Sequence, residues 1–235
     1  MFRCVLYSLL LSLSITPLIA SAGVVVGGTR LIFDGSRKEA SLSVRSNDKD
    51  KSPYLIQSFI DNNGPKGNTP SPDKLPFIVT PPLFRLEAGQ ENVLRIIRTG
   101  GALPEDRESV FWMNVKAIPA NNPADSGKNV LRFSIKNRIK LFYRPPSLKK
   151  QPEKLFNDVT FSATGDTLTV HNPTGYYLTF YSLSVGGQSV DTTDVMVPPK
   201  GSARYHLRKM GVGPVKFQYI NDYGSASDVL TVGML

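Results

Sequence analysis

Residues 129–145 read N-V-L-R-F-S-I-K-N-R-I-K-L-F-Y-R-P and alternate between apolar and mostly cationic side chains, with Asn137 as an interruption. Such period-two alternation is typical of a β-strand with one buried face. We therefore predict a long strand over residues 129–143. The apolar positions of the segment are Leu131, Phe133, Ile135, Ile139, Leu141 and Tyr143, and the cationic positions are Arg132, Lys136, Arg138, Lys140 and Arg144.

This predicted strand is longer than one domain needs. At ~3.3 Å per residue, the row from Leu131 to Tyr143 would extend roughly 43 Å, whereas an ordinary strand has about 5–6 residues. A long edge strand with surplus apolar side chains is prone to pair with another chain. We therefore expect the beginning of this strand to project past the core of its own domain and to pair with a partner.

Short β-rich runs separated by turn signals precede the long strand. Gly27-Gly28 interrupts the first run, Pro81-Pro82 interrupts a later one, and Trp112 falls in the sixth strand. About seven strands with turns between them are typical of an antiparallel Greek-key sandwich of the immunoglobulin type, here without the Cys–Trp–Cys core of antibody domains. The expected strands are residues 24–33, 39–45, 54–60, 77–86, 93–98 and 110–118, followed by the long strand.

A second set of β-rich runs follows the break at Arg144-Pro145-Pro146, with residues 148–154 as a linker. Its expected strands are residues 159–162, 167–171, 177–185, 195–197, 203–207, 215–220 and 229–232. The sequence shows no long amphipathic helix. We therefore predict an all-β protein with an N-terminal immunoglobulin-like domain over residues 23–145 and a C-terminal β-sandwich domain over residues 146–235.

The first 22 residues have the pattern of a secretory signal peptide. Arg3 supplies a basic start, residues 5–19 are apolar, and Ala20-Ser21-Ala22 fits the small-residue cleavage pattern. A membrane anchor is the weaker alternative, because the apolar stretch is short and contains Pro17 and several serines. We expect cleavage after Ala22 and export. The single cysteine, Cys4, would be removed with this segment, so the mature chain would have no disulfide.

The chain is basic, with a formal net charge of +9 from 28 Lys and Arg against 19 Asp and Glu. Removing Arg3 leaves 27 cations against 19 anions, or +8. A basic exported protein could bind nucleic acid, anionic lipid or acidic proteins. Nucleic acid is the poorest of these candidates outside the cytoplasm, and we predict no nucleic-acid partner.

The residues needed for common catalytic and metal sites are absent or scattered. Only two histidines occur, His171 and His206, and zinc-binding spacings, His-Glu-x-x-His, Cys-His pairs and Gly-x-Ser-x-Gly are all missing. The paired glycines fit turns better than a phosphate loop, since none opens a predicted helix. The sequence therefore predicts a protein that is not an enzyme, with no cofactor, no metal site and no small-molecule substrate.

Six segments, in order along nearly the whole mature chain, resemble the periplasmic chaperones of chaperone–usher pili. They are residues 29–33, 53–58, 78–84, 103–114, 138–145 and 219–224, and the runs P-E-D-R-E-S and I-K-L-F-Y-R-P are the most specific. The likeness is closest to the type 1 and P pilus chaperones of the short-loop class. It implies two immunoglobulin-like sandwiches in a boomerang with a cleft between them, in the periplasm, and donation of a strand to pilus subunits that lack their own last strand.

The resemblance also implies roles for particular residues. The donor strand would fill the subunit's groove, two cations in the cleft would bind the subunit's C-terminal carboxylate, a trio would join the domains, and an apolar patch would face the outer-membrane usher. Read without the resemblance, the same residues would be ordinary core residues, solvated surface charges, a surface salt bridge and a common apolar cluster. The donor-strand residues are Leu131, Phe133 and Ile135, and the cations in the cleft are Arg30 and Lys140. The trio that joins the domains is Glu108, Arg144 and Asp222, and the usher-facing patch is Pro53, Leu55, Leu83 and Ile118.

Two other functions remain open from the sequence. A pilus subunit or adhesin is the main rival, although such subunits usually hold a cysteine pair and are shorter. A secreted β-sandwich carbohydrate-binding module is the second, and the scarcity of paired acids counts mildly against it. For a chaperone, the expected partners are pilus subunits and the usher, and a homodimer that caps the free protein stays open.

Overall fold

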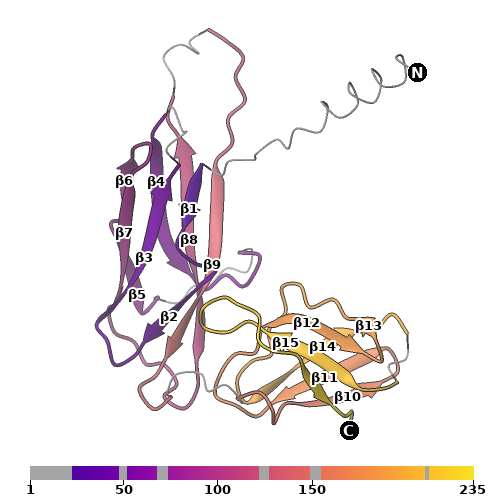
Figure 1. Ribbon diagram of the computed structural model, residues 1–235. Helices are drawn as coiled ribbons and strands as arrows, with labels where there is room; N and C mark the ends of the chain where they lie inside the picture. Colours follow the sequence, from indigo (N-terminus) through magenta and orange to yellow (C-terminus); the bar gives the residue numbers. More distant parts are fainter. Residues whose placement is uncertain (1–22, 48–51, 68–73, 122–126, 149–154, 210–211) are drawn as a thin grey trace, which may run out of the picture.

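The computed structural model describes residues 23–47, 52–67, 74–121, 127–148, 155–209 and 212–235 (Figure 1). All regular elements in these ranges are β-strands, as the sequence predicts. The described residues include no helix that could cross a membrane. The predicted signal peptide and Cys4 lie outside the described residues.

In the described residues, nine strands form the first sandwich. One sheet has the order β1-β3-β7-β5, and the other has the order β2-β9-β8-β4-β6. The strands are β1 (Val24–Val26), β2 (Arg30–Asp34), β3 (Glu39–Ser46), β4 (Tyr54–Asp61), β5 (Phe77–Thr80), β6 (Leu83–Leu86), β7 (Glu91–Arg98), β8 (Ser109–Pro119) and β9 (Ile135–Arg144).

Alternating side chains place the core of this sandwich between its two sheets. In β4, Ile56 and Ile60 are buried, whereas Leu55 and Phe59 are exposed on the opposite face. Phe33 and Leu141 come from neighbouring strands and are fully buried in the same cluster. The side chains of β9 that face the other sheet, Ile139, Leu141 and Tyr143, therefore belong to the core of this sandwich.

Seven strands in the described part of the chain form the second sandwich, which has a separate hydrophobic core that includes Phe161, Phe180 and Phe217. Its sheets have the orders β10-β11-β14 and β13-β12-β15-β16. The strands are β10 (Thr160–Thr164), β11 (Thr167–Asn172), β12 (Phe180–Val185), β13 (Gln188–Ser189), β14 (Gly201–His206), β15 (Val215–Tyr219) and β16 (Leu230–Val232).

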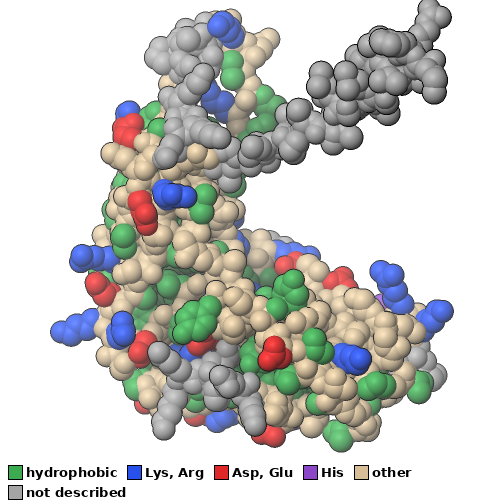
Figure 2. Space-filling model, in the orientation of Figure 1, with side chains coloured by type: hydrophobic (Ala, Val, Ile, Leu, Met, Phe, Trp, Pro, Cys, Tyr) green, Lys and Arg blue, Asp and Glu red, His purple; other side chains and the backbone are tan. Residues whose placement is uncertain are grey.

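The two sandwiches meet at an angle at the end of β9, so that the molecule is bent like a boomerang (Figure 1). Figure 2 shows the hollowed face between them. A cavity of about 620 Å³ opens at the junction, and its walls include Arg30, Arg144, Asp222 and Tyr223. Residues of both sandwiches therefore line the space between the two arms.

The structure corrects two expectations about strand pairing. Residues 127–134 are not in a strand, and β9 begins at Ile135 rather than at residue 129. A strand exists only where a neighbour completes its hydrogen bonds, and the neighbouring β8 ends at Pro119, two residues beyond the partner of Ile135. In addition, β2 pairs with β9 in parallel, so the expected wholly antiparallel sandwich is wrong at this edge.

Smaller differences occur in the second sandwich. The expected strand over residues 195–197 is reduced to an isolated bridge between Leu178 and Val197. The two-residue strand β13 is too short to give a periodic pattern, and the sequence did not predict it. These differences do not alter the two-layer architecture.

Candidate functional site

The apolar residues at the beginning of β9 lie outside the core. Leu131, Phe133 and Ile135 are exposed by 79%, 72% and 61%, respectively. Leu131 and Phe133 precede the strand, and Ile135 is its first residue. Single exposed apolar residues are common, but three in one alternating row form a patch that is typical of an interaction surface.

The backbone next to this row is also open on one side. β9 pairs with β8 from Ile135 to Tyr143, whereas its pairing with β2 covers only Lys140 to Arg144. Within the described part of the chain, the edge from Ile135 to Ile139 has no strand beside it on the β2 side. An incoming strand could therefore continue the sheet there, which is the strand-addition mode of peptide recognition.

Two cations lie where this open edge ends. Arg30 and Lys140 are direct partners in the parallel pair of β2 and β9. Nη1 of Arg30 donates to the carbonyl oxygen of Ile220 at 2.9 Å, and its guanidinium lies 5.7 Å from the ring centroid of Phe142. Its Nε is buried without a hydrogen-bond partner among the described residues. Arg30 therefore contacts both sandwiches and has an unsatisfied donor.

The surroundings of the two cations disfavour their positive charge. Burial and the nearby charge of Arg30 together lower the pKa of Lys140 to about 8, against the opposing charge of Asp194. Burial also lowers the pKa of Arg30, although Asp222 and Glu108 raise it. No ion pair joins Lys140 to a carboxylate in the described ranges. An anionic group placed between the cations would relieve this cost.

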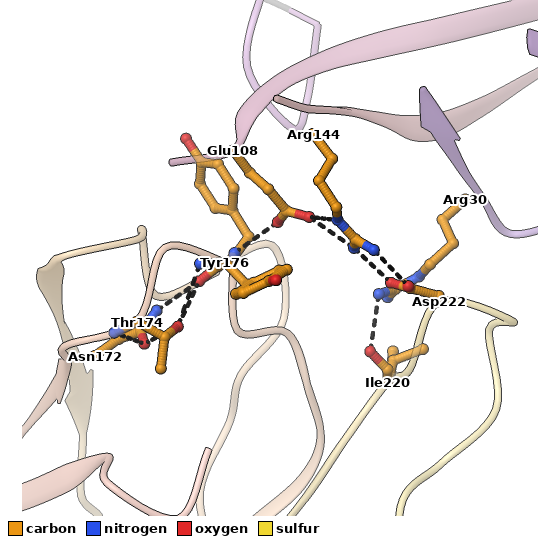
Figure 3. A network of polar contacts seen from close by, with 9 residues as sticks. Arg30, Glu108, Arg144, Asn172, Thr174, Tyr176, Ile220 and Asp222 are labelled. Carbon is orange, nitrogen blue, oxygen red and sulfur yellow. Dashed lines mark hydrogen bonds and ion pairs between the residues drawn. The ribbon is translucent and has the colours of Figure 1, made fainter. Parts of the chain in front are cut away.

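Arg144, the last residue of β9, is joined to one acid from each sandwich (Figure 3). Its Nε and Nη2 donate to Oε1 of Glu108 at 2.9 and 2.8 Å. Its Nη1 and Nη2 donate to Oδ2 and Oδ1 of Asp222 at 2.7 and 2.8 Å. Because Asp222 follows β15 and the other two residues belong to the first sandwich, this trio connects the two arms at the bend.

Glu108 adds further contacts to the second sandwich. Its Oε2 accepts a hydrogen bond from the backbone N–H of Tyr177 at 2.8 Å, and its own N–H donates to the carbonyl oxygen of Gly175 at 2.8 Å. Burial raises the pKa of Glu108, while the charge of Arg144 opposes this change. The side chains of Glu108 and Arg144 are only 3% and 7% exposed. The trio is therefore not the surface salt bridge that the sequence alone allows.

A glycine positions the acid that comes from the second sandwich. Asp222 lies in a turn in which the N–H of Gly224 donates to the carbonyl oxygen of Asn221 at 3.0 Å. Gly224 has φ +84°, and a Cβ there would lie 2.5 Å from Oγ1 of Thr29. Only glycine fits this turn against β2 without strain, and the close approach places Asp222 beside Arg144.

We expect Asp222→Ala to change the angle between the sandwiches more than the stability of either one. Removing Asp222 leaves Arg144 paired with Glu108 within the first sandwich but removes its ionic contact with the second. Glu108→Ala should instead lower the free energy of unfolding by about 3–5 kcal/mol, since the buried guanidinium of Arg144 loses its ion pair with Glu108. Small-angle X-ray scattering and thermal melting measure the two effects.

Asp228→Ala is the matched control, because it removes from the same sandwich an exposed carboxylate that is not bonded to Arg144. It should leave both the scattering curve and the melting temperature unchanged. Scattering curves that are identical for the wild type, Asp222→Ala and Asp228→Ala would show that Asp222 does not hold the angle between the two sandwiches.

Three residues of the predicted usher patch lie on the neighbouring strands β4, β6 and β8, and the fourth, Pro53, directly precedes β4. Leu55 of β4 is opposite Ile118 of β8, and Leu83 of β6 is opposite Gln57, two residues further along β4. Leu55 and Leu83 are exposed, whereas Pro53 and Ile118 are half-buried. The structure therefore brings these residues together as a partly exposed apolar patch.

A polar cluster around Arg138 was not predicted from the sequence. Nη1 and Nη2 of Arg138 donate to Oδ2 and Oδ1 of Asp61 at 2.6 and 2.7 Å, and Nη1 also donates to Oδ1 of Asn114 at 2.8 Å. Its guanidinium lies 4.9 Å from the ring centroid of Trp112. Burial raises the pKa of Asp61, but hydrogen bonds from Arg138 and Asn114 and the charge of Arg138 outweigh this effect and hold the pKa below its ordinary value. The cluster neutralises Arg138 and joins β9 to β8 and β4.

Comparisons with known proteins agree with this architecture. The family model described as "Pili and flagellar-assembly chaperone, PapD N-terminal domain" matches residues 23–149, and "Pili assembly chaperone PapD, C-terminal domain" matches residues 154–230. The chain is 46% identical to the chaperone protein LpfB of Salmonella typhimurium over 216 residues. This aligned region covers 90% of this chain and 89% of LpfB.

Solved structures give the same result. The chain is similar to the Salmonella enterica SafA pilin in complex with the SafB chaperone, with a TM-score of 0.77, 34% identity and coverage of 92% of this chain and 99% of the matched chain. It is also similar to the periplasmic chaperone SfaE, with a TM-score of 0.74, 41% identity and coverage of 91% and 100%. Both similarities extend over both sandwiches.

Proposed function

The chain belongs to the PapD family of pili assembly chaperones, and on this basis we propose that it caps pilus subunits by donating β9 and the segment before it. The observation that carries the proposal is the row of Leu131, Phe133 and Ile135, which is exposed beside an open strand edge. A subunit that lacks its last strand has an apolar groove and two unpaired backbone edges. The donor segment supplies both missing parts.

The segment before β9 gains its strand structure on binding. In the free protein, residues 129–134 are not in a strand because no neighbour pairs with them. Between two subunit strands, the same residues find hydrogen-bond partners on both sides. The apolar side chains then point into the groove at every second position, and burial of each contributes about 1.5–3 kcal/mol.

Arg30 and Lys140 bind the C-terminal carboxylate of the subunit. The pairing of these two residues across β2 and β9, with an unsatisfied Arg30 donor and no carboxylate partner for Lys140 in the described ranges, supports this role. The contact also sets the register of the added strand. A slip by one residue would turn every side chain of that strand away from its intended face.

The trio of Glu108, Arg144 and Asp222 holds the two arms so that the cleft keeps its shape. The patch of Pro53, Leu55, Leu83 and Ile118 delivers the loaded chaperone to an outer-membrane usher. The exposed side chains of Leu55 and Leu83 on one face support this second role. Subunit capture and usher binding thus use different surfaces of the first sandwich.

We place the mature protein in the periplasm after cleavage behind Ala22. The similarity of this chain to the periplasmic chaperone SfaE and the composition of residues 1–22 support this location. We assign the protein no catalytic activity, because capping a subunit makes and breaks no covalent bond. The chaperone occupies the surface through which subunits contact one another until the subunit is delivered to the usher.

Co-purification from the periplasm tests the proposal. The full-length chain, tagged at its C-terminus and expressed in a piliated strain, should be recovered with a stoichiometric amount of a pilus subunit that mass spectrometry identifies. Recovery of a glycan without a subunit would favour a carbohydrate-binding module. Incorporation of the tag into purified pilus fibres would favour a pilus subunit or adhesin.

A further inference from the structure

Two lysines of like charge face each other on the outer surface of the donor edge. Lys136 of β9 lies directly opposite Lys116 of β8 in the antiparallel register. Side chains at such positions have Cβ atoms about 4.5–5.5 Å apart, and two like charges there destabilise the pair. The free protein therefore has an unfavourable contact next to the strand that it donates.

Nothing in the described part of the chain relieves this contact. Neither Lys116 nor Lys136 has an ion pair with a carboxylate there, and the neighbour of Lys116 on its other side is the uncharged Gln57. The situation two residues further along β9 is different, because Asp61 neutralises Arg138. The sheet thus contains a carboxylate partner for Arg138, but its described residues contain none for Lys116 and Lys136.

Further cationic residues lie along the donor strand in both directions. Lys140 follows at the same face of β9, and Arg132, which donates a hydrogen bond to Asn121, precedes β9 in the exposed segment. When residues 129–134 are extended between subunit strands, alternation places Arg132 on the same outer face as Lys136, opposite to the face of Phe133. The donor strand then presents apolar side chains to the groove and cations to the outer surface.

We propose that this outer cationic face selects pilus subunits that carry Asp or Glu on the strand that pairs with the open edge of β9. The inference rests on the proposed function and adds a determinant of partner choice to it. The apolar row fits any subunit with an open groove. The cations distinguish between subunits, because an acidic cross-strand neighbour relieves the repulsion between Lys116 and Lys136 and a basic one adds to it.

The position of Lys136 favours the subunit over other acidic partners. Lys136 adjoins Ile135, in the part of β9 whose free edge would pair with the subunit. A carboxylate on the added strand would lie one inter-strand distance away, about 4.7–4.9 Å. The excess of positive charge on the mature chain, 27 cations against 19 anions or +8 once Arg3 is removed, also accelerates the encounter with an acidic partner.

Rebinding kinetics test the inference. The probe is the pilus subunit purified in complex with the wild-type chain, released in denaturant and mixed with each chaperone variant at several salt concentrations. Lys136→Glu should lower the association rate about tenfold at low salt, and the difference should fall below about twofold at high salt, where charges are screened. The matched control, Lys216→Glu, reverses an exposed lysine on β15 and should alter the rate less than about twofold.

A chemical cross-link gives an independent measurement. A carbodiimide joins an amine directly to a carboxylate in contact with it, so the complex should give a peptide in which Lys136 or Lys116 is joined to Asp or Glu of the subunit. Lys136→Arg keeps the charge, should bind normally and should lose the link at Lys136. Charge-insensitive rebinding of Lys136→Glu, or a complex without a subunit link at either lysine, would overturn the inference.

The outcome for Phe133→Asp separates this inference from the proposed function. If Phe133→Asp fails to bind while Lys136→Glu binds like the wild type, the donor strand operates without charge selection and only the further inference is wrong. If Phe133→Asp binds like the wild type, the strand is not donated and both proposals are wrong.

Discussion

Replacing Phe133 with aspartate should abolish the capture of pilus subunits and leave the chaperone folded. The side chain is 72% exposed in the free protein, so the substitution should change the free energy of unfolding by no more than about 0.5 kcal/mol. In the complex, the same position would be buried in an apolar groove. The variant loses about 1.5–3 kcal/mol of apolar burial and must also desolvate a carboxylate, so we expect a loss of affinity greater than about 1000-fold.

Leu131→Asp and Ile135→Asp should behave in the same way, because both residues belong to the same exposed row. The matched control is Val212→Asp, in which a side chain that is 79% exposed on the second sandwich acquires the same charge. The measurement is recovery of soluble subunit from the periplasm together with circular dichroism of the free variants. A large fall in melting temperature for Phe133→Asp alone would assign Phe133 to the core. Normal subunit recovery by all three variants would contradict strand donation.

Sequence alternation predicted most strands because each strand of a sandwich has one face in the core. The inward residues of β4, Ile56 and Ile60, are separated by exposed ones, and this local pattern is visible without knowledge of neighbours. Residues 129–134, which precede β9, have the same pattern but no strand beside them in the described part of the chain. Their apolar side chains therefore indicate a strand that forms in a complex, and the free chain leaves residues 129–134 without strand pairing.

The polar parts of the site could not be predicted from spacing. Arg138 and its partner Asp61 are 77 residues apart, and neither has a local pattern that marks the other. The trio of Glu108, Arg144 and Asp222 was predicted from the family resemblance alone. Its burial became evident only from the structure, in which Tyr177 and Gly175 enclose Glu108. Long-range contacts of this kind depend on the packing of two sandwiches, and no periodicity in the chain records that packing.

Loss of the charge at Lys140 should have the second large effect, on binding of the subunit's C-terminus. Lys140→Met keeps the apolar stem and removes a half-buried cation, so the chaperone should remain folded. The complex loses a charge-assisted contact of about 1.5–3 kcal/mol, or about tenfold to 150-fold in affinity. Arg30→Ala is the less selective variant, since it also removes the hydrogen bond to Ile220 that crosses between the sandwiches.

The depressed pKa of Lys140 adds a pH dependence to this prediction. Its pKa is about 8 because of burial and the charge of Arg30, and a bound carboxylate would raise it. Below this pKa the lysine is already protonated and ready to bind. Above it, binding must take up a proton, so affinity for a C-terminal subunit peptide should fall by about an order of magnitude between about pH 7 and pH 9.5. Lys140→Met should lose most of this dependence.

Two synthetic peptides with the C-terminal sequence of the captured subunit decide whether the carboxylate itself is bound. One ends in a free carboxylate and the other in an amide, so that they differ only in the group that Arg30 and Lys140 would contact. Titrated against the wild-type chaperone, the amide should bind as weakly as the free acid binds Lys140→Met, and its affinity should not change with pH over the same range. Lys140→Arg should restore the charge but only part of the affinity, because a planar guanidinium and a compact ammonium present different donor geometries. Equal affinity of the wild type for the two peptides would rule out the carboxylate clamp, and the register of the donated strand would then have to be set by the groove residues alone.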